Sequence, residues 1–154
     1  MTQPSETLVL GGERVVFPVL AFSRRLGVVN RKQNPNELTT TTTAGIRNGL
    51  FDDLLLVDAA LHGFEIKETQ IRGGVGPFWG FTPFLNRRVR VELIPARVRP
   101  VSLDEVKALV SESIRKWKDV WASGGNLKEL QQTFQRAGSI SEMSEALFRE
   151  FSRR

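Results

Sequence analysis

The sequence predicts an α+β fold: an antiparallel β-sheet or partly open small barrel of about five to seven strands (residues 7–100), packed against three C-terminal α-helices. Two observations lead to this prediction. Apolar and polar side chains alternate through much of residues 7–100, which is the period of a half-buried strand. From residue 101 onward, apolar side chains instead recur at helical intervals. With 154 residues, the chain is expected to form a single domain, 1–154.

The first hundred residues begin with a predicted hairpin. Thr7–Leu10 and Arg14–Phe22 are expected to be strands, joined by two glycines that can both take the positive φ of a tight turn. Pro18 inside the second run indicates an edge strand or a bulge, because proline has no N–H for the ladder. The following stretch, Ser23–Glu37, is polar, basic and rich in turn-forming residues, so we expect a mobile loop there.

The middle of the chain predicts an edge strand followed by a second hairpin. Leu38–Thr43 contains five consecutive threonines, whose β-branched and polar side chains favour a strand at the edge of a sheet. Turn-forming residues dominate Ala44–Asp53. Leu54–Val57 is a short apolar run typical of a central strand, and alternation predicts a partner strand over Phe64–Ile71. The loop of this hairpin is expected at Asp58–Gly63.

The stretch Arg72–Ile94 joins an aromatic, glycine-rich loop to an arginine-bearing strand. Glycine and proline exclude a regular helix over Gly73–Pro83, because glycine costs backbone entropy and proline lacks a donor. Apolar residues then alternate with charged ones, which predicts a half-buried strand with a charged outer face. We expect its buried positions to be Val89, Val91 and Leu93.

The arginines of this strand change phase along the chain. Arg88 and Arg90 stand at even positions, whereas Arg97 and Arg99 stand at odd ones. A bulge or bend near Pro95 would bring all four side chains back to one face of the strand. If Pro95 instead ends the strand, the two pairs of arginines point in different directions.

The C-terminal third predicts three helices, over residues 102–122, 126–137 and 139–152. Each opens with Ser or Asn followed three residues later by Glu, the spacing of a capping box, and glycines end the first two. Each helix has one apolar stripe, and the open face of the preceding sheet is the expected cover. A separate helical domain of about 50 residues is the alternative, although such a small unit would be marginally stable.

Composition excludes several classes of protein. The chain has no cysteine and one histidine, so disulfides, thiolate metal sites and His-pair metal motifs are excluded, and we expect no metal or other cofactor. The longest apolar run, Val15–Phe22, is eight residues long and contains a proline. A bilayer-spanning helix needs about 20 apolar residues, so we expect no membrane partner and a cytoplasmic location.

The net charge of +5 is concentrated in two basic runs, which favour acidic partners. The first contains Arg24, Arg25, Arg31 and Lys32, and the second contains Arg87, Arg88, Arg90, Arg97 and Arg99 with Glu92 as its single acid.

No catalytic motif is found in the sequence. A dinucleotide-binding loop would need a third glycine at the position of Trp79, and Pro77 removes a backbone donor that a phosphate requires. His62 could act as a general base oriented by Asp52, Asp53 or Asp58, but a polar residue beside Gly63 is more typical of a turn. An enzyme with an unrecognised Asp, Glu or His site is therefore the least favoured function.

We expect a non-catalytic binding module that docks an acidic protein partner, by analogy with small bacterial adaptor and immunity-type proteins. Aromatic and arginine side chains are enriched at interaction hot spots. The expected partner-binding residues are Phe78, Trp79, Arg87, Arg88, Arg90, Arg97 and Arg99. The alternative is a nucleic-acid-binding β domain that uses the same basic surface together with Arg24 and Arg25. Self-association through the threonine edge or the helical tryptophans is a further possibility.

Overall fold

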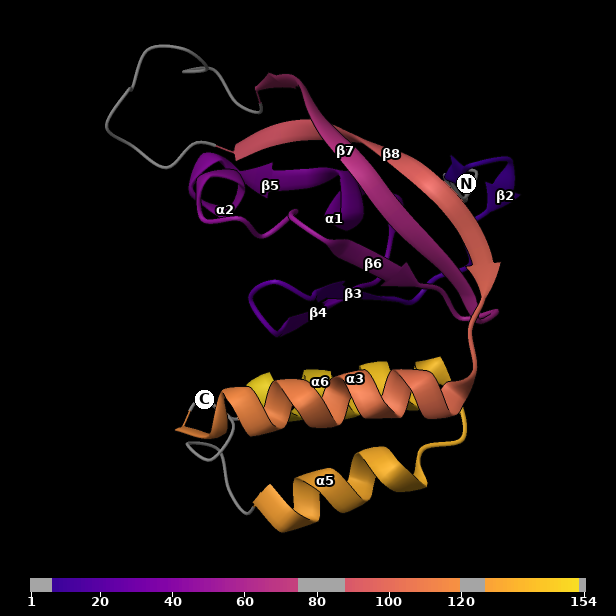
Figure 1. Ribbon diagram of the computed structural model, residues 1–154, viewed down its shortest axis with the longest axis vertical. Coiled ribbons are helices and arrows are strands. Elements are labelled where there is room, and N and C mark those ends of the chain that lie inside the picture. Colours follow the sequence, from indigo (N-terminus) through magenta and orange to yellow (C-terminus); the bar gives the residue numbers. More distant parts are fainter. Residues whose placement is uncertain (1–6, 75–87, 120–126, 153–154) are drawn as a thin grey trace, which may run out of the picture.

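The computed structural model describes residues 7–74, 88–119 and 127–152 (Figure 1). Six antiparallel strands form one sheet in the order β4-β3-β6-β7-β8-β5. Their bounds are β3 (Val19–Ser23), β4 (Val28–Lys32), β5 (Thr40–Thr42), β6 (Leu54–Val57), β7 (His62–Gly74) and β8 (Arg88–Pro100). The long strands β7 and β8 arch over the rest, so the sheet is a curled half-barrel (Figure 1). The predicted antiparallel, partly open sheet is confirmed.

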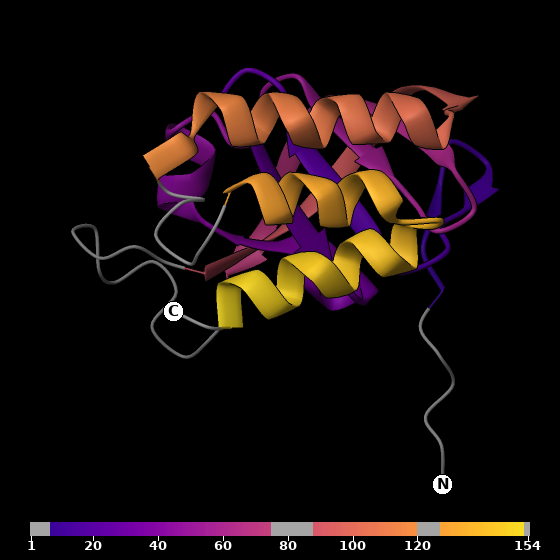
Figure 2. The same cartoon turned by 90° about the horizontal axis from the view of Figure 1, so that it is seen from below.

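Three C-terminal helices are present, as predicted: α3 (Leu103–Lys116), α5 (Leu127–Arg136) and α6 (Ile140–Ser152). The first is shorter than the predicted 102–122, because Trp117 leaves the helical conformation and caps α3. Helices α3 and α6 pack against the sheet at β3 and β4, whereas α5 packs on the far side of these two helices (Figures 1 and 2). The helices therefore cover the sheet. None of the described helices is both long enough and apolar enough to cross a membrane.

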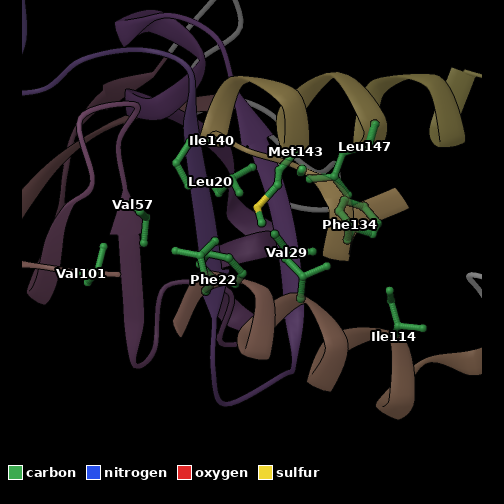
Figure 3. Packing of buried hydrophobic residues seen from close by; sticks show 14 of the residues in the cluster. Leu20, Phe22, Val29, Val57, Val101, Ile114, Phe134, Ile140, Met143 and Leu147 are labelled. Atoms are coloured by element: carbon green, nitrogen blue, oxygen red, sulfur yellow. The ribbon is translucent and has the colours of Figure 1, made fainter. Parts of the chain in front are cut away.

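Each face of the sheet carries its own hydrophobic core. On the outer, convex face, side chains of β3, β4 and β6 pack with the three helices (Figure 3). The labelled members of this outer core are Leu20, Phe22, Val29, Val57, Val101, Ile114, Phe134, Ile140, Met143 and Leu147. On the inner, concave face, alternate residues of β3 and β6 pack with β7, β8 and the short segments between strands. Adjacent residues such as Val19 and Leu20 point into opposite cores, as the strand period requires.

The N-terminal hairpin is confirmed as a separate two-stranded sheet, β1 (Val9–Leu10) with β2 (Glu13–Arg14). Its two glycines have φ values of 59° and 83°, as a tight turn requires. The expected long second strand is wrong, because pairing stops before Pro18 and a new strand, β3, begins at Val19. Strand β3 lies inside the sheet between β4 and β6, so the expected edge position is also wrong.

The expected mobile loop over Ser23–Glu37 is wrong as well. It contains β4 and the short helix α1 (Pro35–Thr39). Val29 is buried in the outer core, and this burial stabilises β4 although its neighbours are polar. Asn34 caps α1, since its side chain accepts a hydrogen bond from the Glu37 N–H at 2.8 Å.

The threonine run is confirmed as an edge strand, because β5 is the last strand of the described sheet beside β8. The strand is shorter than expected, since Thr39 belongs to α1 and Thr43 begins a second short helix, α2 (Thr43–Arg47). The Thr42 Oγ1 accepts the Gly45 N–H at 3.1 Å and caps α2. The first part of Ala44–Asp53, where turns alone were expected, is therefore helical.

The predicted central strand and second hairpin are confirmed: β6 lies between β3 and β7 and pairs with both. The predicted bend in the arginine strand is also confirmed. Glu65 pairs with Arg97 and Ile66 pairs with Pro95, so Ala96 is an extra residue at which the register shifts. Because β8 continues through this bulge to Pro100, its arginines on either side face away from the inner core.

Candidate functional site

Four of the seven expected partner-binding residues can be placed. Phe78, Trp79 and Arg87 lie outside the described residues. The other four are on β8, in two pairs separated by the bulge, Arg88 with Arg90 and Arg97 with Arg99. The two pairs lie on the same outer face of the strand but in different surroundings.

Arg88 and Arg90 are exposed, and the residue between them, Val89, is fully buried in the inner core. Neither arginine forms an ion pair within the described part of the chain. Both are cross-strand neighbours of β5, since Thr42 pairs with Arg88 and Thr40 pairs with Arg90. Directly opposed residues place their side chains on the same face of the sheet. We call these two arginines and two threonines the basic face.

Among the described residues, the surroundings leave the basic face open and positively charged. On the β7 side, Arg90 lies opposite Gly73, and a Cβ built on this glycine would meet no atom within 4 Å. Further along β8, Glu92 is paired with Arg72, so this acid is already neutralised. In Figure 1 the N-terminal end of β8 is at the upper left, and helices α3, α5 and α6 are at the bottom.

Arg97 and Arg99, by contrast, contact acids of the protein itself. Arg97 donates to the Glu65 carboxylate, and Arg99 lies 3.8 Å from Glu65 and 3.0 Å from Glu105 of α3. The hydrogen bond from Arg97 lowers the pKa of Glu65; partial burial of the carboxyl opposes this shift, and the charges of Arg97, Arg99 and Arg24 add to it. These two arginines thus join β7, β8 and α3 rather than standing free.

The first basic run is also largely neutralised within the fold. Arg24 Nη2 lies 2.7 Å from Asp53 Oδ1, and Arg25 pairs with Asp52. Arg31 crosses to α6, where its Nε donates to Ser144 Oγ at 2.8 Å. Its guanidinium also lies 4.6 Å from the centre of the exposed Phe148 ring, a cation–π contact.

His62 and Asp58 are joined in the connection between β6 and β7. The buried Asp58 carboxylate accepts the N–H groups of Val16, Ala60 and His62 at 3.0, 3.0 and 2.8 Å, and its Oδ2 lies 3.2 Å from His62 Nδ1. All of these contacts fix the β6–β7 connection. The other two candidate aspartates contact arginines instead.

The space beside His62 contains one carboxylate, that of Glu13. It is an open depression of about 410 Å³ between β8 and the N-terminal hairpin, and the hairpin contributes Gly11 and Glu13. Its described lining contains no serine, threonine or lysine that could act as a nucleophile. In the described ranges no three His, Asp or Glu residues group closely enough to hold a metal ion.

The pairing of the arginines with threonines could not be found from the sequence. The threonine run and the arginine strand are almost 50 residues apart, and only the sheet order places them side by side. The sequence shows only local signals: the arginine strand alternates polar and apolar residues, and the threonine run is polar and β-branched throughout. Chemically, the basic face offers guanidinium forks and hydroxyl groups, which are donors suited to carboxylates or phosphates.

Comparison of the chain with protein families, with curated proteins and with solved structures gives no significant match.

Proposed function

We propose that the protein is a non-catalytic binding module that docks an acidic protein partner, as adaptor and immunity-type proteins do. The centre of the proposed surface is the basic face, and Arg88 and Arg90 are its main contacts. Phe78, Trp79 and Arg87 belong to the proposal because Arg87 immediately precedes β8 and the two aromatic residues stand ten and nine positions before it in the sequence. Arg97 and Arg99 are assigned to the stability of the fold instead.

One observation carries the proposal: Arg88 and Arg90 form an exposed pair without an acidic partner in the described part of the chain. Most other arginines of the two basic runs hold acids of the protein itself. Two adjacent unpaired guanidinium groups repel each other, and an external carboxylate would relieve this repulsion while forming charge-assisted hydrogen bonds.

The same observation disfavours nucleic acid as the partner. Proteins that bind nucleic acid through its backbone commonly neutralise about 6–10 phosphates. Of the arginines expected to contact phosphates, Arg24, Arg25, Arg97 and Arg99 are paired internally. A compact patch of two free arginines suits a localised acidic site on a protein better than a long phosphate backbone.

The test is a charge reversal, Arg88→Glu with Arg90→Glu, and its control is Arg136→Glu with Arg149→Glu. The control arginines are exposed on α5 and α6, and both double variants change the net charge equally. Each form is used to purify partners from the native cell, with mass spectrometry and a nucleic-acid readout. Binding is then measured with the purified partner.

We expect the wild type and the control to retain an acidic protein that the Arg88/Arg90 variant loses. The purified pair should lose affinity as salt is raised, less steeply than a protein that binds many phosphates. Submicromolar oligonucleotide binding at physiological salt that requires Arg88 and Arg90 would replace the proposal by the nucleic-acid alternative. An unchanged set of partners for the variant would overturn both.

A further inference from the structure

We propose that the acidic partner presents an extended segment to the basic face, with acidic side chains on alternate residues. This inference rests on the proposed function and specifies the chemistry of the partner. Three observations support it: the spacing of Arg88 and Arg90, the threonine beside each of them, and the glycine opposite Arg90.

The spacing of Arg88 and Arg90 matches that of an extended chain. Two residues apart on one strand, their Cα atoms are separated by about 6.6–6.8 Å. A second extended chain repeats its side chains on one face at this same interval. Two acidic residues in alternate positions can therefore meet both guanidinium groups without strain. A helix returns to the same face after three to four residues and presents a curved surface to the sheet.

Each arginine has a threonine as its cross-strand neighbour, and the two threonines differ. Thr42 Oγ1 accepts the Gly45 N–H at 3.1 Å, which leaves its hydroxyl proton available for an outside acceptor. The Thr40 hydroxyl is directed to Asn36 Oδ1 at 3.4 Å. The Arg88–Thr42 pair thus supplies one more donor to a carboxylate than the Arg90–Thr40 pair, and we expect it to bind more strongly.

The surface on the β7 side of Arg90 gives the extended segment room. Gly73 lies opposite Arg90 and has no side chain, and the Arg72–Glu92 ion pair limits the positive charge further along β8. An acidic segment that ran past Arg90 along β8 would meet this ion pair, which has no net charge to attract it. The segment should therefore be short and centred on the two free arginines.

The test uses two fluorescent peptides of identical composition, one with glutamate and serine alternating and one with glutamates in adjacent pairs. Their binding to the full-length wild type is measured by fluorescence anisotropy. We expect the alternating peptide to bind about fivefold more tightly, since the paired arrangement places one glutamate of each pair on the wrong side of an extended chain. Arg88→Lys should weaken binding of the alternating peptide more than Arg90→Lys, because lysine lacks the bidentate fork.

Arg136→Lys, on α5, is the matched control and should leave the binding of both peptides unchanged. Equal affinity for the two peptides, with both lost in the Arg88→Glu/Arg90→Glu variant, would overturn the inference and leave the proposed function standing. Absence of binding to either peptide would overturn the inference as well. Tighter binding of a single-stranded oligothymidylate than of the alternating peptide would overturn both the inference and the proposed function.

Discussion

Glu65 shows how one side chain decides which arginines are available for binding. Its carboxylate accepts from Arg97, lies 3.6 Å from Arg24 and 3.8 Å from Arg99, and is only 21% exposed. Without it, three guanidinium groups, two from β8 and one from the turn after β3, would face one another. Arg88 and Arg90 have no comparable acid among the described residues. Arg97 and Arg99 thus differ from Arg88 and Arg90 in having an acid of β7, Glu65, beside them.

Glu65→Gln should lower the free energy of unfolding by roughly 1–2 kcal/mol at neutral pH, because three arginines lose a charged partner. The pKa of Glu65 is lowered in the folded state. Its stabilising contribution is therefore complete above the ordinary pKa of 4.5 and is lost as the pH falls through the lower folded value. Urea denaturation of both proteins at pH 7 and pH 3 measures this difference.

The matched control for this pH dependence is Glu112→Gln. Glu112 pairs with Arg115 on the exposed surface of α3, where such pairs contribute about 0.3–0.5 kcal/mol. A cost of Glu65→Gln that is equal at the two pH values would contradict an electrostatic role for Glu65.

At the scale of elements, the β3–β4 turn is fastened to the end of α3. Trp117 Nε1 donates to the Leu26 carbonyl at 2.8 Å, and Lys116 Nζ donates to the Arg25 carbonyl at 3.3 Å. Gly27 permits this approach: its φ is +70°, and a Cβ there would lie 2.5 Å from Lys116 Cδ. The turn depends on glycine both for its backbone conformation and for the space beside α3.

Gly27→Ala should therefore cost roughly 1–3 kcal/mol of unfolding free energy, measured by urea denaturation. Gly12→Ala is the matched control: Gly12 also has a positive φ, +83°, but its Cβ would meet no atom within 4 Å. The control isolates the cost of the backbone conformation. The difference between the variants reports the contact with α3, and equal costs would mean that Lys116 moves aside freely.

The sequence predicted the elements whose signals are local and missed those that depend on distant partners. The capping of α3 is local: Ser102 Oγ accepts the Glu105 N–H at 3.1 Å, three residues apart. Strand β4 has only two consecutive valines before Asn30, and its burial comes from helices more than 70 residues away. From the sequence alone, the polar pattern of β4 therefore resembled that of a loop.

At the scale of the whole molecule, the outer core links the sheet to all three C-terminal helices. Phe134 of α5 and Phe64 of β7 are almost fully buried, in the outer and inner cores respectively. The two cores share the strands β3 and β6, whose alternate residues belong to each. We therefore expect damage to either core to destabilise the whole chain, as a single domain requires.

Phe134→Ala and Phe64→Ala should each cost about 3–5 kcal/mol and should shift one common unfolding transition. The measurement is thermal unfolding followed by far-ultraviolet circular dichroism and by tryptophan fluorescence. Phe148→Ala, at a position 51% exposed, is the control and should cost much less. Two separate transitions, with Phe134→Ala moving only the helical one, would show that helices and sheet fold independently.

The candidate site was predictable at this scale only in part. The charge pattern located a basic strand and the bend within it, because both are read from neighbouring residues. Whether an arginine is paired with an acid depends on residues that are distant in the sequence: Arg97 contacts Glu65, 32 positions away. The threonine neighbours of Arg88 and Arg90 were likewise hidden until the strand order was known.

The direction of β8 has a mechanical consequence. The strand runs from the basic face, along its ladder with β7, to the residues just before α3. A partner that pulled on Arg88 and Arg90 along the strand axis would load the bonds between β7 and β8 in shear, so many would have to break together. A pull at right angles to the strand would break these hydrogen bonds one at a time, at far lower force. If the proposed partner binds there, the attachment would resist tension along β8 far better than tension across it.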